Sequence, residues 1–438
     1  MSTGLEIIRG KISDLYRYRD EYFLQTNEHE WPQKRSAIET KVMVCYSEIC
    51  KELENHINHV DKAEYYFLKG WLLNIRDQYD PNVFESLTKS IKFRPDNQQA
   101  WLELGECYFK KQQLNLAKNC FEKVLQLNPM EKRALRNLSI MLRSNQCGRS
   151  LEEKHHDIVK SIELAKKAVE CDVNDSDSWA ILGNAYLTLL FMSSIGSRSD
   201  LLDRCKSAYQ KAINDPIVRT KSDVLFNYST VLQYDEEFEQ AIQCLHDAYR
   251  YDSEWLELTN KKQRLLNLFA DICHGNKLDR TVIKAKKLSS IKEQLQSEES
   301  RLKCQFENKE KFFNGQTKLI DELCEKANDC LLVCRIVSYV SDPHNIFFSS
   351  IYITIDSRGH TITLFVYDLV KNKGPRPGDT LLIIKPYLKE YRIKFEEQEF
   401  QFKALRIVDP LQEMLINNMP ITKDCVAIPT INVTLKSD

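Results

Sequence analysis

The chain has 438 residues, of which 42% are hydrophobic and 29% charged, and its formal net charge is −1. This length predicts two to four domains with cores of their own, and the near-neutral charge excludes the strongly basic class of nucleic-acid-binding proteins. The 14 cysteines are irregularly spaced behind an N-terminus that lacks the apolar core of a secretory signal, which favours reduced cysteines in a cytoplasmic and nuclear protein. No apolar run approaches the roughly 18 residues of a membrane span, so no membrane contact is expected.

Two amphipathic helical segments occupy residues 1–60 and are divided by the sequence TNEHEWPQ. The terminal units of a stacked repeat array need an altered outer face. These segments are therefore predicted to form an N-terminal helical cap.

A strong repeat signature lies at residues 101–129, WLELGECYFKKQQLNLAKNCFEKVLQLNP. Gly105 and Ala117 are small where two helices are expected to cross closely, and Pro129 ends the second helix because proline lacks a backbone N–H. The unit matches the tetratricopeptide repeat (TPR) consensus at Trp101, Leu104, Gly105, Tyr108, Ala117, Phe121 and Pro129.

Further copies of this unit flank it. Weaker ones lie at residues 66–95 and 134–172, and clearer ones begin with WAILGNAY at 179–186 and with LFNYSTVLQYDEEFEQAI at 225–242. About five repeats exceed the three or so that bury a continuous core. Residues 61–274 are therefore predicted to form a TPR array that ends in a capping helix.

Residues 275–325 are charged and poor in aromatics, and they are predicted to form a linker that is helical or partly disordered. Over residues 326–438 the hydrophobic period changes to two, which indicates strands. The strand candidates are residues 330–340, 345–356, 360–368, 380–388, 391–395 and 400–408. Their order favours an OB-fold, with an SH3-like barrel as the alternative. The predicted fold class is mainly α: a TPR α-solenoid followed by a small C-terminal β-barrel.

Signatures of catalysis are missing. The sequence lacks a P-loop and the GxGxxG, GxSxG and HExxH motifs. Cys324, Cys330 and Cys334 are close together but do not have the paired CxxC spacing of a zinc site. We therefore predict no catalytic residues, no cofactor and no metal, and interpret the chain as a non-enzymatic adaptor that binds peptide segments of protein partners.

Binding is expected on the concave face, which the first helix of each repeat lines. In that helix, positions 2, 5, 9, 12 and 13 of the consensus point into the groove. They include Arg143, Asn184, Asp223 and Glu257, which are predicted to face one trough. A guanidinium binds a carboxylate bidentately, and a carboxylate can hold an arginine or an α-amino group. The trough would thus suit a short peptide that carries both charges.

Two other surfaces remain open to nucleic acid. Lys89 and Lys92 lie on the outer face of the first repeat and could contact a phosphate backbone. OB-folds often stack bases on aromatic side chains. The barrel candidates for such stacking are Phe365, Tyr367, Tyr387, Tyr391 and Phe395, interleaved with Lys385, Lys389, Arg392 and Lys394.

Nearly the whole chain resembles the tetratricopeptide repeat protein 5 family, also called Strap. The resemblance is carried by LTKSIKFRPDNQQAWLELGECYFKK, RNLSIMLR, SWAILGNAYL, YDEEFEQAI and GDTLLIIKPYLKEYRI. It implies recognition of nascent tubulin N-termini at the ribosome, followed by decay of tubulin mRNA. It also implies a stress-responsive nuclear cofactor that assembles acetyltransferase coactivator complexes.

The resemblance also implies roles for particular residues. The nascent-peptide residues of the family fall on Arg143, Asp223 and Glu257, and its ribosome-contacting lysines fall on Lys89 and Lys92. The expected partners are therefore nascent tubulin, the ribosome and transcriptional coactivators.

Overall fold

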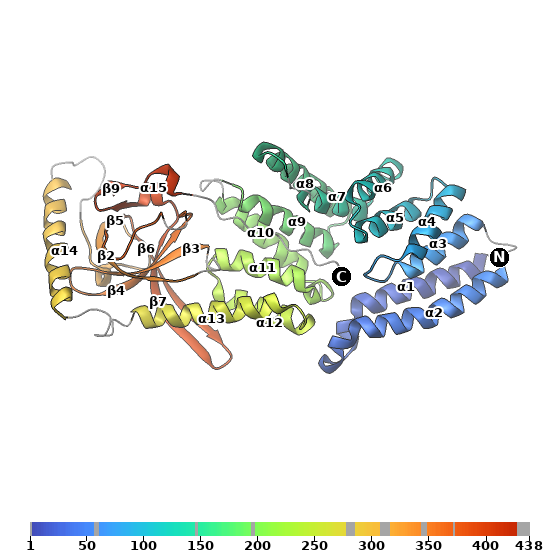
Figure 1. Ribbon diagram of the computed structural model, residues 1–438, viewed down its shortest axis with the longest axis horizontal. Coiled ribbons are helices and arrows are strands. Elements are labelled where there is room, and N and C mark those ends of the chain that lie inside the picture. The colour runs from blue at the N-terminus through green and yellow to red at the C-terminus, as the bar shows by residue number, and fades with distance from the viewer. Residues whose placement is uncertain are drawn as a thin grey trace.

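The computed structural model describes residues 2–56, 61–144, 148–193, 198–276, 285–306, 316–342, 348–370 and 373–426. It is elongated, with stacked helices at one end and a β-barrel at the other (Figure 1). The helices ahead of the barrel are α1 Ser2–Gln25, η1 Glu28–Gln33, α2 Lys34–His56, α3 Lys62–Leu73, α4 Pro81–Phe93, α5 Gln98–Lys110, α6 Leu114–Leu127, α7 Lys132–Ser144, α8 Leu151–Cys171, α9 Ser176–Leu190, α10 Arg198–Ile213, η3 Val218–Thr220, α11 Ser222–Tyr234, α12 Phe238–Tyr251, α13 Leu256–Asn276 and α14 Ala285–Phe306.

The TPR array consists of helix pairs α3–α4, α5–α6, α7–α8, α9–α10 and α11–α12. Within a pair the helices approach very closely at the small residue of the first helix. A Cβ added at Gly105 would lie 2.5 Å from the Phe121 ring, and one at Gly70 would lie 2.7 Å from Leu87. The small consensus residues are therefore required by packing, as the repeat pattern indicates.

Local capping explains where several of these helices begin. The side chains of Asp80, Asn97 and Asp175 accept backbone N–H bonds from the first turns of α4, α5 and α9. Such caps satisfy N–H groups that have no partner inside the helix. Pro81 occupies the first turn of α4, where its missing N–H costs nothing.

The N-terminal helices α1 and α2 form a hairpin against the first repeat. Ile8, Ile12 and Leu15 of α1 are buried in one cluster with Phe67 of α3 and Val42 of α2. The tip of the hairpin, around η1, extends along the array as far as α12 (Figure 1). The N-terminal segment thus contacts both the first and the last repeat.

The C-terminal sheet has the strand order of an OB-fold. Strands β2, β3 and β4 form an antiparallel meander, β4 pairs in parallel with β7, β7 pairs with β6, and β5 closes the barrel on β2. The strands are β1 Lys326–Ala327, β2 Leu331–Val340, β3 Ser349–Ile355, β4 Thr361–Tyr367, β5 Thr380–Ile384, β6 Tyr387–Phe395, β7 Gln398–Ile407, β8 Met414–Ile416 and β9 Met419–Pro420. The short helix η4 Ile320–Glu322 precedes β1, α15 Pro410–Glu413 lies between β7 and β8, and η5 Lys423–Cys425 follows β9.

One strand boundary differs from the sequence-based expectation. The break between β5 and β6 falls at Lys385 and Pro386 rather than near residue 390. Lys385 has a φ of 51° and Pro386 has no N–H for the ladder, so the chain bends there. Together β5 and β6 act as one bent strand that closes the barrel.

Helices cover the barrel on two sides. Helix α14 lies against β2 within the segment expected to be a linker, and its Ile291 and Leu295 are buried there. Helix α13 corresponds to the capping helix expected at the end of the array. Phe269 and Ile272 of α13 are buried against the barrel, so the barrel takes the place of solvent at the end of the array.

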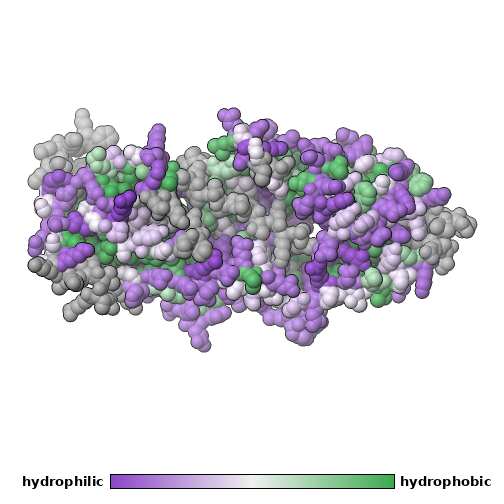
Figure 2. Space-filling view, in the orientation of Figure 1, coloured by the Kyte–Doolittle hydropathy of each residue, from purple (hydrophilic) through white to green (hydrophobic). Residues whose placement is uncertain are grey.

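The array and the barrel share one hydrophobic core. Phe238 of α12 lies 5.5 Å from Tyr391 of β6, and Phe269 lies 6.3 Å from Phe402 of β7, between ring centroids. The surface is otherwise largely hydrophilic on the face shown in Figure 2, with scattered hydrophobic residues. Within the described residues no helix is long and apolar enough to span a membrane.

Candidate peptide-binding groove

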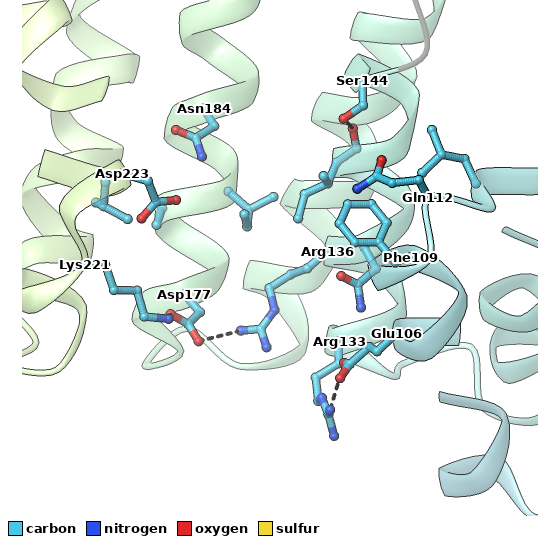
Figure 3. A pocket seen from close by; sticks show the side chains of 16 residues that line it. Glu106, Phe109, Gln112, Arg133, Arg136, Ser144, Asp177, Asn184, Lys221 and Asp223 are labelled. Carbon is cyan, nitrogen blue, oxygen red and sulfur yellow. Dashed lines mark hydrogen bonds and ion pairs between the residues drawn. The ribbon is translucent and has the colours of Figure 1, made fainter. Parts of the chain in front are cut away.

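The concave side of the array contains a cavity of about 530 Å³ between α5, α7, α9 and α11 (Figure 3). The side chains that line it are Glu106, Phe109, Gln112, Leu114, Arg133, Arg136, Asn137, Ile140, Ser144, Asp177, Ala180, Ile181, Asn184, Lys221, Asp223 and Val224. The lining combines polar and apolar side chains. A cavity of this size and mixed lining suits an extended peptide with charged and apolar side chains.

Several of the charged residues that line the groove form ion pairs with one another. Arg133 lies 2.8 Å from Glu106, and Lys221 lies 2.8 Å from Asp177. Arg136 also pairs with Asp177, at 3.5 Å. Burial raises the pKa of Asp177, but Lys221 and Arg136 outweigh it and lower that pKa to about 2. The groove therefore carries fixed charges of both signs at neutral pH.

Arg143 lies beneath the floor of this cavity and not in its lining. Its side chain is only 8% exposed, and its Nη1 donates to the Ile181 carbonyl at 3.2 Å and to Ser161 Oγ at 3.3 Å. In the described part of the chain its Nε and Nη2 have no hydrogen-bond partner. Burial lowers the pKa of Arg143 to about 10, although Tyr209 opposes this. The residue is thus a buried cation with unsatisfied donors.

Asp223 and Asn184 do line the cavity, as expected from the repeat register. Asn184 is buried, and its Oδ1 accepts hydrogen bonds from Tyr209 Oη at 2.5 Å and from Asn227 Nδ2 at 3.1 Å. Asp223 lies in the first turn of α11, and both Asp223 and Arg143 act electrostatically on the pKa of Tyr209, which burial chiefly raises. Tyr209 is therefore close enough to both Asp223 and Arg143 to be influenced by their charges.

Glu257 lies outside this cavity, on the exposed surface of α13. It precedes Lys261 by one helical turn. Burial lowers the pKa of Lys261 to about 7, and Glu257 acts in the opposite direction. The three residues thus differ in position: Asp223 lines this cavity, Arg143 is buried without lining it, and Glu257 is exposed on α13. That they act together on one peptide stays a prediction.

Three residues that line the groove were not predicted from the sequence: Arg133, Arg136 and Asp177. Arg133 and Asp177 hold position 2 of their repeats, as Asp223 does, and Arg136 holds the groove position 5. Applying the register to every unit, and not only to isolated charges, would have found them. Lys221 precedes its helix, and no repeat position marks it.

Lys89 and Lys92 lie on the second helix of the first repeat, away from the groove. Lys89 Nζ donates to Glu85 at 2.6 Å, and this hydrogen bond raises the pKa of Lys89. Lys92 is exposed, and so is the neighbouring Phe93. The two lysines thus share one outer surface.

The barrel aromatics are not a base-stacking surface. Phe365, Tyr367, Tyr391 and Phe395 are 0–7% exposed and belong to the core shared with the helices. Of the five candidates, Tyr387 is the exposed one, at 38%. The array covers the strands on which OB-folds usually bind oligonucleotides. Four of the five aromatic side chains predicted to stack on bases are therefore inaccessible.

The basic residues between those aromatics are also engaged. Lys385, Lys389, Arg392 and Lys394 each lie within 3.7 Å of a carboxylate. Paired cations release fewer counterions on meeting phosphate. This arrangement gives no support to a strand-binding barrel.

A cluster of potential metal ligands occurs at the β3–β4 turn. Within the described residues, Asp321, Asp356 and His360 are a group whose ligand atoms lie within 4.8 Å of one another. Asp356 Oδ1 accepts the backbone N–H groups of Gly359 and His360, and its Oδ2 accepts that of Ile320. The carboxylate is therefore occupied in holding the turn.

Stacked helix pairs around a charged concave groove, followed by an OB-fold domain packed on the last repeats, define a TPR protein-interaction module. The family model for the tetratricopeptide repeat protein 5 OB fold domain matches residues 315–430, and that for the tetratricopeptide repeat matches residues 99–130. The match of the barrel domain and the similarity of nearly the whole chain to proteins of this name support the tetratricopeptide repeat protein 5 family.

Similar proteins include tetratricopeptide repeat protein 5 of Homo sapiens, 28% identical over 98% of this chain and 96% of the human protein. The protein of the same name in Mus musculus is 27% identical with the same coverage. Among solved structures, a thermophilic TPR protein of Thermus thermophilus is 13% identical with a TM-score of 0.38, over 47% of this chain and 99% of that one.

Proposed function

We propose that this protein is an adaptor that recognises the N-terminal peptide of nascent tubulin at the ribosome and promotes decay of tubulin mRNA. Two charged residues carry the proposal. Asp223 is an anion that lines the groove, and Arg143 is a buried cation with two unsatisfied donors. A peptide that begins Met-Arg-Glu offers a cation and an anion in adjacent positions. The resemblance of the chain to the tetratricopeptide repeat protein 5 family implies the same ligand.

The charges suggest how such a peptide would be held. The α-amino group or the arginine of the ligand would pair with Asp223, and its glutamate would reach Arg143 past Ile181. Charge-assisted hydrogen bonds of this kind contribute about 1.5–3 kcal/mol each. The apolar walls at Phe109 and Ile140 would contact the side chains that follow.

Asp223→Asn is expected to weaken binding of a ten-residue peptide that begins Met-Arg-Glu by at least about tenfold, because the amide keeps the shape of the carboxylate but not its charge. Isothermal titration calorimetry with the full chain measures the effect. Asp200→Asn, at an exposed acid in the first turn of α10, is the matched control and should bind normally. Equal affinity of the wild type for a peptide with the same residues in permuted order would overturn the ligand assignment.

Replacing both Lys89 and Lys92 by glutamate is expected to weaken co-sedimentation with ribosomes strongly while leaving peptide affinity unchanged. Two lost phosphate contacts would lower the slope of log affinity against log salt by about 1.5. The matched control is Lys118→Glu with Lys123→Glu, on the second helix of the next repeat. Ribosome binding that survives the first pair, or is lost with the second, would contradict this placement of the ribosome contact.

A further inference from the structure

The N-terminal hairpin closes the open side of the TPR array. Its tip, residues 23–34, contacts the corner between α12 and α13, although 222 positions separate Glu28 from its partner Arg250. Trp31 and Tyr251 lie 4.9 Å apart between ring centroids, and Phe23 and Tyr251 lie 5.2 Å apart. An array that would otherwise be an open superhelix is thereby closed into a ring.

Charge adds to this aromatic contact. Arg250 forms an ion pair with Glu28, and its guanidinium carbon lies 5.4 Å from the centre of the Trp31 ring. Lys34 lies 4.4 Å from the Phe23 ring. Exposed ion pairs and cation–π contacts each contribute little, so the charged contacts alone do not lock the tip in place.

A second cavity, of about 510 Å³, lies directly inside this closure. The hairpin supplies one wall, with Arg19, Trp31 and Arg35, and the α12–α13 corner supplies the other. Lys221 and Asp223 line this cavity and also the groove described above. The two cavities therefore adjoin at Lys221 and Asp223.

We infer that residues 23–34 form a clasp that gates the groove, and that the cavity behind it binds the part of the peptide ligand that follows the residues held at Asp223. This inference rests on the proposed function. The occupant is an extended polypeptide segment, because the space adjoins the groove and offers an aromatic face at Trp31 beside cations at Arg19 and Arg35. Ligand residues beyond about the fourth would lie against the clasp.

The first test of the clasp needs no ligand. Glu28→Arg places two arginines together, so faster hydrogen exchange is expected at the backbone amides of residues 250–252. Combining Glu28→Arg with Arg250→Glu reverses the pair and should restore the wild-type exchange rate. Glu48→Arg, at an exposed position of α2, is the matched control. Unchanged exchange in Glu28→Arg would overturn the clasp.

The second test separates the two parts of the ligand by length. The probes are peptides of four and ten residues that begin Met-Arg-Glu, titrated into the full chain by calorimetry. Trp31→Ala and Glu28→Arg should weaken the ten-residue peptide about fivefold, the factor that corresponds to ~1 kcal/mol, and leave the four-residue peptide unchanged. The double reversal should restore the affinity for the longer peptide.

The outcomes distinguish this inference from the function on which it rests. Equal losses for both peptides, or no loss for either, would overturn the second subsite while the groove assignment stands. If the wild type binds neither peptide, the proposed function and the second subsite both fail, and the exchange experiment alone decides whether the clasp exists.

Discussion

Replacing Glu236 by alanine is expected to lower the free energy of unfolding by about 3–5 kcal/mol, the range for removal of one partner from a buried ion pair. Glu236 lies in the turn between α11 and α12, and its side chain is fully buried in the barrel interface. It accepts hydrogen bonds from Tyr367 at 2.6 Å and Tyr391 at 2.5 Å. Arg406 lies 3.1 Å away and Lys389 3.4 Å away.

The surroundings of this carboxylate explain the size of the effect. Burial, followed by the charge of Glu236, raises the pKa of Tyr367 and of Tyr391 well above the ordinary value, so both stay protonated as donors. In the alanine variant two hydroxyls lose their acceptor and two cations their counter-charge. Glu236 also has a φ of 62°, a strained backbone geometry that persists only where the surroundings enforce it.

Chemical denaturation followed by circular dichroism and tryptophan fluorescence measures this prediction. Glu239→Ala, at an exposed acid in the first turn of α12, is the matched control and should cost no more than about 1 kcal/mol. Glu236→Gln should give an intermediate loss, because the amide oxygen can still accept one hydroxyl. A midpoint for Glu236→Ala equal to that of Glu239→Ala would show that the carboxylate does not join the two domains.

The second large effect is expected at Arg143, where binding and stability should change independently. Arg143→Met should reduce affinity for the peptide that begins Met-Arg-Glu by about 10- to 150-fold, which corresponds to a lost charge-assisted hydrogen bond of 1.5–3 kcal/mol. The same variant should keep its stability within about 1 kcal/mol or gain some. A buried cation with unsatisfied donors is itself costly, and an apolar side chain of similar length removes that cost.

A loss of affinity without a loss of stability would identify Arg143 as a ligand-binding residue and would exclude a purely structural role. If Arg143 served only the core, its loss would destabilise the fold and weaken binding together. Because its pKa of about 10 leaves it charged at neutral pH, affinity should not vary between pH 6 and pH 8 through this group. Arg204→Met, at an exposed site of α10, is the control. Normal affinity in Arg143→Met would remove Arg143 from the site.

Much of the fold follows from local patterns. The small residue of each repeat, Gly105 for example, is fixed by the Phe121 ring it meets sixteen positions later, so spacing alone reveals the helix pair. The alternating pattern after residue 326 likewise predicts the strands, and their order predicts the OB-fold. The register of the repeats also places Asp223 and Asn184 in the groove.

Register alone does not give the depth of a side chain. Arg143 and Ser144 hold adjacent groove positions of one helix, yet Ser144 lines the cavity and Arg143 lies beneath it. The difference comes from the closeness of α8 and α9, which offer Ser161 and the Ile181 carbonyl to the guanidinium. Helix-packing distances of this kind depend on several elements at once.

The sequence by itself determined the repeat architecture, the barrel and the charged character of the groove, because these depend on residues a few positions apart. Only the tertiary structure decided which surfaces remain open. Glu236 meets Tyr367 across 131 positions and Arg250 meets Glu28 across 222, and neither pair has a signature in the intervening sequence. Such contacts bury the barrel aromatics and close the array, since they depend on how whole domains pack and not on the spacing of residues along one element.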